Sequence, residues 1–214
     1  MGKIKKGILG SFSGKVGTVV GAVWNGIGYM RSLPSSVTNP NTEKQQSQRS
    51  RFSLVLAFLK AITAFIREGY KLYASGKTAF NAAMSYIVQN AISGEYPDFS
   101  LDYSAILVAR GSLTAAQDAA ADISADAAAF SWVDNSGTGT AAADDVAMLL
   151  VFDIDRTEAI YSTAGGVRSD ASASLSLPSY WAGETVEAYL AFQSADGTAV
   201  SNSSYLGEFT VPTA

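Results

Sequence analysis

The sequence predicts an α+β protein, in which an N-terminal β-hairpin and an antiparallel helical hairpin precede an antiparallel β-sandwich. Three observations predict it. An Asn-Gly pair at 25–26 separates two apolar runs, apolar residues recur every three or four positions over 52–66, and short apolar runs divided by turn residues follow residue 101. We therefore expect a basic N-terminal region at 1–100 and an acidic sandwich at 101–214.

Residues 1–14 form a leader of lysines, glycines and a few apolar residues. Glycine loses the most conformational freedom on ordering and chain ends are poorly held, so we expect this leader to be ordered only when it packs on another surface. That surface is either the chain's own domain or a neighbouring subunit. The leader has no long apolar segment and no cleavage site of a secretory signal, which predicts synthesis in the cytoplasm.

The hairpin is predicted at Asn25-Gly26, between GTVVGAVW and IGYMRSLP. Asn-Gly supplies the two positive-φ residues of a type I′ turn, whose twist matches that of paired strands. A lone hairpin is marginally stable in water, so we expect it to pack on the helices or on another subunit.

The first helix is predicted to start at Thr42-Glu43-Lys44-Gln45, which has the spacing of a capping box. Its apolar face is read from the three- and four-residue spacing. The residues of this face are Phe52, Val55, Leu56, Phe58, Leu59, Ile62, Phe65 and Ile66. A second helix is expected at 78–92, folding back on the first.

From 103 onward, seven short runs predict strands of an immunoglobulin- or fibronectin III-like sandwich. The runs are YSAILVAR, AFSWV, VAMLLVFDI, EAIYS, ASLSL, TVEAYLAFQ and SYLGEFTV. With no cysteine present, the disulfide-bonded antibody type is excluded. The alanine-rich segment 114–129 is compatible with a helix by propensity. We favour a loop followed by a strand there, because alternating residues follow at 130–133.

The composition argues against an enzyme. The chain has no cysteine and no histidine, which removes thiolate nucleophiles, disulfides, histidine acid-base chemistry and the Ser-His-Asp triad. The net charge of -4 is unevenly distributed. Residues 1–80 carry 12 Lys and Arg against 2 Asp and Glu, and residues 81–214 carry 3 against 17. This segregation of charge favours binding of the basic residues 1–80 to phosphates or to an acidic protein surface.

No catalytic, cofactor-binding or metal-binding residue is predicted. The phosphate-loop pattern fails at Leu9 and Val16, where it requires glycine and a hydroxyl residue. The paired acids Asp144-Asp145 and 153–155 lack the spacing of a calcium loop, and we expect the second pair in a solvated loop. The longest apolar run, 13 residues interrupted by Lys60, is too short to cross a bilayer. We expect no cofactor, no small-molecule substrate and no membrane partner.

The candidate interaction surface combines basic residues of the front half with two aromatic residues, the combination that non-specific nucleic-acid binders use. Its members are Lys3, Lys5, Lys6, Lys15, Trp24, Tyr29, Arg31, Lys44, Arg49 and Arg51. The alternative is a solvated basic surface with Trp24 and Tyr29 buried beneath the hairpin. No helix-turn-helix, RNP or KH signature decides between them.

The motifs GKVG…W.G…Y.RSLP and NP.TE.Q..QR..F resemble an uncharacterised family of short bacterial and phage proteins of the Bacteroidetes lineage. The segments LPSYWAGETVEAYLAF and SNSSYLGEF resemble its back half, so the likeness covers most of the chain. The family carries no known activity. The second motif is similar to segments of phage structural genes, which implies a virion or assembly role by analogy.

These observations predict a non-enzymatic structural protein. We expect a phage virion component, such as a capsid, head-associated or tail protein, whose basic N-terminal arm contacts other copies of itself or other virion proteins. Two alternatives remain open: a nucleic-acid-binding protein that uses the basic half, and a surface- or carbohydrate-binding module that uses the sandwich. The expected location is the virion, or the cytoplasm under the alternatives.

Overall fold

The computed structural model describes residues 2–4, 7, 10–24, 26–36 and 39–213. The chain divides into two compact units, residues 1–42 and residues 43–214, which we call the N-terminal unit and the main unit. The sequence placed the division near residue 100. The structure places it after Thr42, because the helices share a hydrophobic core with a sheet of the main unit.

The N-terminal unit is an antiparallel sheet in the order β1-β2-β3-β4. Its strands are β1 (Lys3–Ile4), β2 (Phe12–Val16), β3 (Val19–Trp24) and β4 (Ile27–Ser32). Strands β3 and β4 pair from Trp24↔Ile27 to Val19↔Ser32, which confirms the hairpin predicted around 25–26. The described part of the leader supplies β1 and the start of β2, so the hairpin gains two further strands.

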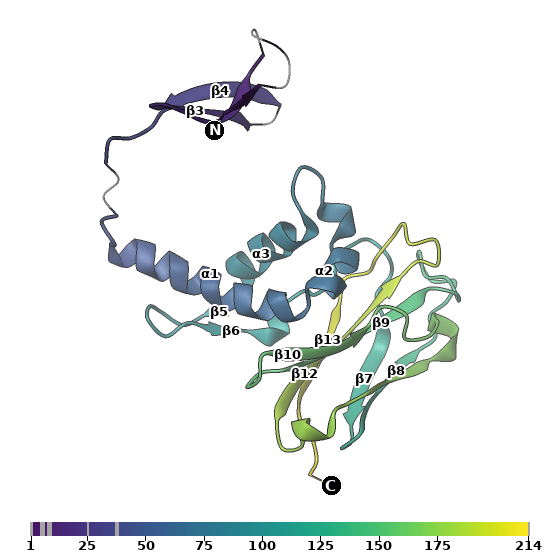
Figure 1. Ribbon diagram of the computed structural model, residues 1–214. Helices are drawn as coiled ribbons and strands as arrows, with labels where there is room; N and C mark the ends of the chain where they lie inside the picture. Colours follow the sequence, from purple (N-terminus) through teal and green to yellow (C-terminus); the bar gives the residue numbers. More distant parts are fainter. Residues whose placement is uncertain (1, 5–6, 8–9, 25, 37–38, 214) are drawn as a thin grey trace. The chain divides into compact units, whose positions relative to one another are not determined.

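Three helices form one layer of the main unit (Figure 1). They are α1 (Glu43–Ala61), α2 (Thr63–Gly69) and α3 (Ala79–Asn90). Helix α1 starts directly after Thr42, as predicted. The predicted continuous helix is interrupted at Ile62, which lies between α1 and α2. Helices α1 and α3 pack side by side and line a common groove.

Two antiparallel sheets form the rest of the main unit. One has the order β10-β9-β12-β13 and the other the order β11-β8-β7. Their strands are β7 (Gln117–Ile123), β8 (Ala127–Val133), β9 (Val146–Asp153), β10 (Glu158–Ser162), β11 (Ser172–Ser176), β12 (Thr185–Gln193) and β13 (Ser204–Thr210). A short pair, β5 (Ile92–Ser93) and β6 (Ser100–Leu101), follows α3.

Strands β9 and β12 are buried on both faces because each face lies against a different layer. Alternate side chains point to opposite faces of a strand. Leu150 and Phe152 therefore join the core beneath the helices, whereas Leu149 and Val151 join the core between the two sheets. This explains why both strands read as nearly continuous apolar runs.

Two predictions about individual segments are settled by the structure. The run at 103–110 was predicted as a strand, which is wrong: it contains the short 3₁₀ helix Tyr103–Ala105 and irregular chain. Its apolar residues Ile106 and Val108 are buried, but they join no ladder. The alanine-rich segment 114–129 was expected to be a loop leading into a strand, with a helix as the alternative. The structure has a full strand there, β7, followed by the start of β8, so the expected loop is wrong over 117–123.

Candidate interaction surface

One face of the N-terminal sheet brings basic and aromatic side chains together. Residues paired across an antiparallel ladder point to the same face, and that face alternates along each strand. Three sets of paired residues therefore point to one face of the sheet: Lys15 with Val20 and Arg31, Ala22 with Tyr29, and Trp24 with Ile27. We call these side chains the open face. Its members are Lys15, Val20, Ala22, Trp24, Ile27, Tyr29 and Arg31.

The open face is apolar at the hairpin turn and basic at the opposite end. Trp24 and Ile27 are 68% and 66% exposed, and with Tyr29 they line an open hollow of about 360 Å³. Lys15 and Arg31 lie two residue pairs further along the strands and are also exposed. The face thus carries both charge and large apolar surface, and it has no acid, since residues 1–42 contain no Asp or Glu.

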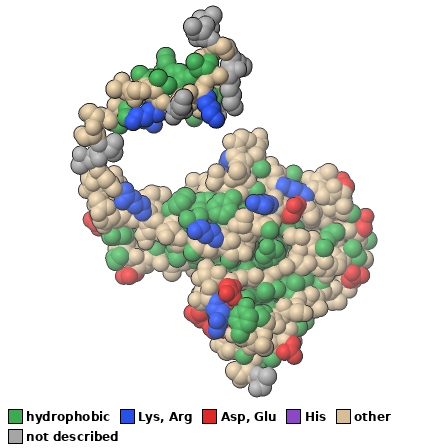
Figure 2. All heavy atoms as spheres, viewed as in Figure 1, with side chains coloured by type: hydrophobic (Ala, Val, Ile, Leu, Met, Phe, Trp, Pro, Cys, Tyr) green, Lys and Arg blue, Asp and Glu red, His purple; other side chains and the backbone are tan. Residues whose placement is uncertain are grey.

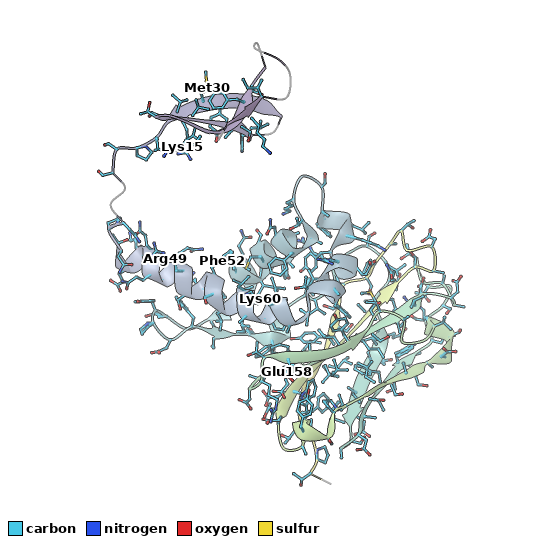
Figure 3. All side chains as sticks on the ribbon, viewed as in Figure 1. Lys15, Met30, Arg49, Phe52, Lys60 and Glu158 are labelled. Carbon is cyan, nitrogen blue, oxygen red and sulfur yellow. The ribbon has the colours of Figure 1, made fainter. Side chains whose placement is uncertain are left out.

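The opposite face of the sheet is partly covered by its own chain. The ring of Phe12 lies against Gly21, and Ser11 lies against Gly28, at points where a Cβ atom would collide. Glycine at these two positions lets the start of β2 cross the β3–β4 hairpin closely. Figure 3 shows Met30 and Lys15 on opposite sides of the sheet. This opposite face also exposes apolar side chains, since Val23 and Met30 are 57% and 70% exposed on it. In Figure 2, the visible hydrophobic patch of this unit lies opposite its basic side chains.

The predicted surface residues separate into the two units. Lys15, Trp24, Tyr29 and Arg31 meet on the open face. Lys3 is exposed on β1, and Lys5 and Lys6 lie outside the described residues. The remaining three, Lys44, Arg49 and Arg51, belong to α1 of the main unit.

Arg51 has a packing role in the main unit. Its guanidinium lies 4.5 Å from the centroid of the Phe99 ring, in the range of a cation–π contact. Its Nε atom is buried and has no hydrogen-bond partner. We infer that Arg51 helps hold the segment containing Phe99 against α1.

A second apolar feature, which the sequence analysis did not single out, is a groove between α1 and α3. Phe52 is 48% exposed there, although its spacing predicted it on the buried face (Figure 3). The groove has a volume of about 350 Å³. It is lined by Gln48, Phe52, Asn81, Met84, Ser85, Val88 and Gln89. The sequence hinted at this exposure in one way, because Phe52 directly follows the polar first turns of α1.

One member of each acidic pair is buried. The expectation of a solvated loop holds for Asp155, which is exposed in a turn, and is wrong for Asp153. The Asp153 side chain is fully buried, and its Oδ1 accepts a hydrogen bond from the backbone N–H of Arg156. Burial raises the pKa of its carboxyl group, although that hydrogen bond and the Arg156 charge act in the opposite direction. Among the described residues, no three carboxylates gather as a metal site would require.

Asp145 belongs to a buried ion pair with Arg168. Its Oδ2 lies 3.0 Å from both Nε and Nη2 of Arg168. The guanidinium also donates to Asn135 Oδ1 at 2.6 Å and to the carbonyl of Thr114 at 2.8 Å. It lies 3.8 Å from the centroid of the Phe192 ring. All its donors are thus directed into the protein, so this cluster joins distant segments and offers no site to a ligand.

A buried carboxyl group lies beneath the helical layer at Glu187. Its Oε2 accepts a hydrogen bond of 2.8 Å from the hydroxyl of Tyr205. Burial raises the pKa of Glu187, and this hydrogen bond partly offsets the effect. Burial also raises the pKa of Tyr103 to about 12. The pKa of Tyr189 is raised for the same reason. Because the folded state disfavours the Glu187 carboxylate, its contribution to stability declines as pH rises above the ordinary range of a glutamate.

None of the helices in the described part of the chain has the length and hydropathy of a membrane span. A family model matches residues 11–207 of the 214. The chain belongs to DUF6266, a family of unknown function. This confirms the resemblance to an uncharacterised domain family. No curated protein and no solved structure matches the chain.

The DUF6266 match spans both units. It begins at residue 11, so it includes β2, β3, β4 and the whole open face, and it ends within β13. Strands β2, β3 and β4 of the N-terminal sheet therefore lie within the family's domain, whereas β1 precedes the matched residues. Because DUF6266 membership assigns no reaction or ligand, the function has to be inferred from the geometry of the surfaces described above.

Proposed function

We propose that this protein is a non-enzymatic assembly protein whose N-terminal sheet binds other protein subunits through its open face. The observation that carries the proposal is the exposure of Trp24, Ile27 and Tyr29 side by side on one face. Aromatic residues are enriched at the centres of protein interfaces, where they supply much of the binding energy. A small sheet that leaves such residues in water gains stability when a partner covers them.

The charge distribution supports a protein partner of opposite sign. Residues 1–42 carry five Lys and Arg and no acid, whereas residues 43–214 carry 10 against 19 Asp and Glu. Complementary charge accelerates encounter and selects among partners. The acidic main unit of another copy has the chemistry that the basic end of the open face would attract.

The virion is the proposed setting for this assembly. Support comes from the NP.TE.Q..QR..F segment at 39–52, which leads into α1 and forms its first half. This segment is similar to segments of phage structural genes. A virion protein fits a chain with two units, one for contacts and one with its own core. We expect the gene to lie beside a capsid or portal gene, and an unrelated neighbourhood would contradict the virion setting.

We expect the combined substitution of Trp24→Ser and Ile27→Ser to weaken self-association of the full chain by roughly 30-fold, the effect of losing about 2 kcal/mol at an interface hot spot. Sedimentation velocity over a concentration series measures this. The control is Leu72→Ser with Val133→Ser, which removes two exposed apolar side chains of the main unit, 46% and 47% exposed. If both double variants associate like the unchanged protein, the open face is not the contact surface.

Nucleic-acid binding is the second candidate, favoured by the register that places Lys15 and Arg31 on the same face as Trp24 and Tyr29. Single-stranded nucleic acid is bound by cations that follow its backbone and by aromatic rings on which bases stack. The open face offers both types of group within one short sheet. The proposal of protein assembly has priority because the larger part of this face is apolar.

If nucleic acid is the ligand, fluorescence anisotropy with a single-stranded oligonucleotide should show affinity that falls steeply with salt. Replacing Lys15 and Arg31 with glutamine should reduce the slope of log K against log salt by roughly 1.4, about 0.7 for each lost phosphate contact. Lys77→Gln, an exposed lysine of the main unit, should leave the slope unchanged. Absence of binding at low salt would remove this candidate.

We also infer that the two larger sheets form an immunoglobulin- or fibronectin III-like sandwich. The strand order supports this: if β7 to β13 are lettered A, B, C, C′, E, F and G, the sheets become E-B-A and C′-C-F-G. Immunoglobulin-type sandwiches likewise place A, B and E in one sheet and C, F and G in the other. Sandwiches of this kind occur in many cell-surface domains, so the fold is compatible with a structural role although it does not assign one.

A further inference from the structure

The outer edge of β4 is a long strand edge that carries a single charged side chain, Arg31. In the described sheet, β4 has β3 on one side and no strand on the other. Natural edges are usually protected by shortness, proline, bulges or charges. At the other end of the sheet, β1 has only two residues. By contrast, β4 has six exposed residues, no proline and no irregularity in its register.

The direction of each backbone group along β4 follows from one hydrogen bond at the end of the strand. The N–H of Leu33 donates to the carbonyl of Thr18, just before β3, at 2.6 Å. Alternate residues of an antiparallel strand direct their N–H and C=O groups to the same side. Tyr29 and Arg31 therefore bond to β3, whereas Gly28, Met30 and Ser32 direct theirs away from the sheet.

We propose that β4 pairs antiparallel with β4 of a second copy about a two-fold axis at Met30. This pairing deepens the assembly function proposed above and rests on it. The axis at Met30 places Met30 opposite Met30 of the second copy, and Gly28 opposite Ser32. Every outward N–H and C=O of the strand then gains a partner. An axis at Tyr29 would leave Ser32 without one.

The side chains are compatible with this register. On the open face, Tyr29 lies opposite Arg31 of the second copy in both directions, so each cation meets an aromatic ring. An axis at Arg31 would instead bring two like charges together, which is destabilising across a ladder. The pairing also joins two open faces into one continuous surface.

The size of the contact predicts how the dimer behaves. One strand pair with its flanking side chains falls well below the ~1,600 Å² of a standard stable interface. We therefore expect a reversible dimer whose population rises with concentration. Stable assembly requires a further contact, which the open face is proposed to provide.

The absence of cysteine from the chain allows a direct test. Met30→Cys should form a disulfide-linked dimer under mild oxidation, because two-fold pairing brings the two Cβ atoms close together. Val23→Cys is the matched control, since Val23 is exposed on the same face but one strand further in. Its counterpart in the second copy would lie three strand spacings away, about 14 Å, which is too far for a disulfide.

Met30→Pro supplies the second arm, read by sedimentation velocity on the full chain. Proline removes an N–H that points away from β3, so the hairpin is retained while the outer edge is blocked. Cross-linking at 30 but not at 23, with dimer loss in Met30→Pro, would support the pairing. Equal cross-linking at both positions, or an unchanged dimer in Met30→Pro, would overturn it. The proposed assembly function would then be tested only by the self-association of the Trp24→Ser and Ile27→Ser double variant.

Discussion

Replacing Asp145 with alanine should lower the free energy of unfolding of the main unit by about 3–5 kcal/mol, the usual cost of leaving one member of a buried ion pair without its partner. Both side chains are almost completely inaccessible, at 0% for Arg168 and 1% for Asp145. The guanidinium would keep its bonds to Asn135 and Thr114 but would lose the one charge that compensates it. Urea unfolding followed by tryptophan fluorescence measures the change.

The control for this variant is Glu68→Ala. Glu68 also forms an ion pair, with Lys71 at 3.4 Å, but its side chain is 47% exposed. An exposed pair contributes about 0–1 kcal/mol, so this variant should unfold nearly as the unchanged protein does. Similar losses for the two variants would show that the Asp145–Arg168 pair is solvated in solution and does not hold the sheets together.

Phe58→Ala is expected to cost about 3–5 kcal/mol, because it leaves a large cavity between α1 and the sheet beneath it. Phe58 is 1% exposed, and its ring centroid lies 4.8 Å from that of Phe152 on β9. Its contact with Tyr103, at 6.1 Å, ties the same helix to the irregular segment that follows β6. Chemical denaturation followed by far-ultraviolet circular dichroism gives the change.

Phe52→Ala is the control for Phe58→Ala, because it makes the same substitution in the same helix at an exposed position. Comparing the two separates the loss of packing from the change in helix propensity. Phe52 is 48% exposed, so its removal leaves little cavity and should cost far less than the removal of Phe58. Hydrogen exchange adds a local readout, since loss of the Phe58 anchor should raise exchange in α1 and α3 before the strands open. Equal destabilisation by both variants would contradict the assignment of the helices to one core with the sheet.

The local sequence was sufficient for several elements. Asn-Gly at 25–26 predicted the hairpin because its backbone preference acts within four residues. The start of α1 and the buried positions Val55, Leu59 and Ile62 followed from the three- and four-residue spacing. Five runs from 146 onward were predicted as strands, and all five are β-strands.

Other elements depended on distant contacts. Within 103–110, the apolar residues at 106, 108 and 109 are buried. The backbone bonds of this segment nevertheless go to single groups, such as the N–H of Val108 to Ser203 Oγ and that of Arg110 to the carbonyl of Gly69. An apolar sequence predicts that a segment is buried, but it does not predict that the segment pairs with a neighbouring β-strand. The alanines of β7 form a strand because β8 pairs with them, which overrides their helix propensity.

The candidate interaction surface likewise depends partly on local sequence and partly on distant contacts. Its residue types could be read from the chain, but their grouping could not, since Lys15, Trp24 and Arg31 share a face only through the register of three strands. Lys44, Arg49 and Arg51 carry the same kind of charge but belong to the other unit.

The sequence by itself determined the β3–β4 hairpin, the apolar stripe of α1, the positions of most strands in the main unit, and the separation of charge between the two ends of the chain. These depend on backbone preferences and on spacing within a few residues. Only the tertiary structure decided which residues are buried together, as with Asp145 and Arg168, and which aromatic residues remain exposed. The reason is physical: burial and pairing are set by segments that are far apart in the chain and are brought together only by the fold.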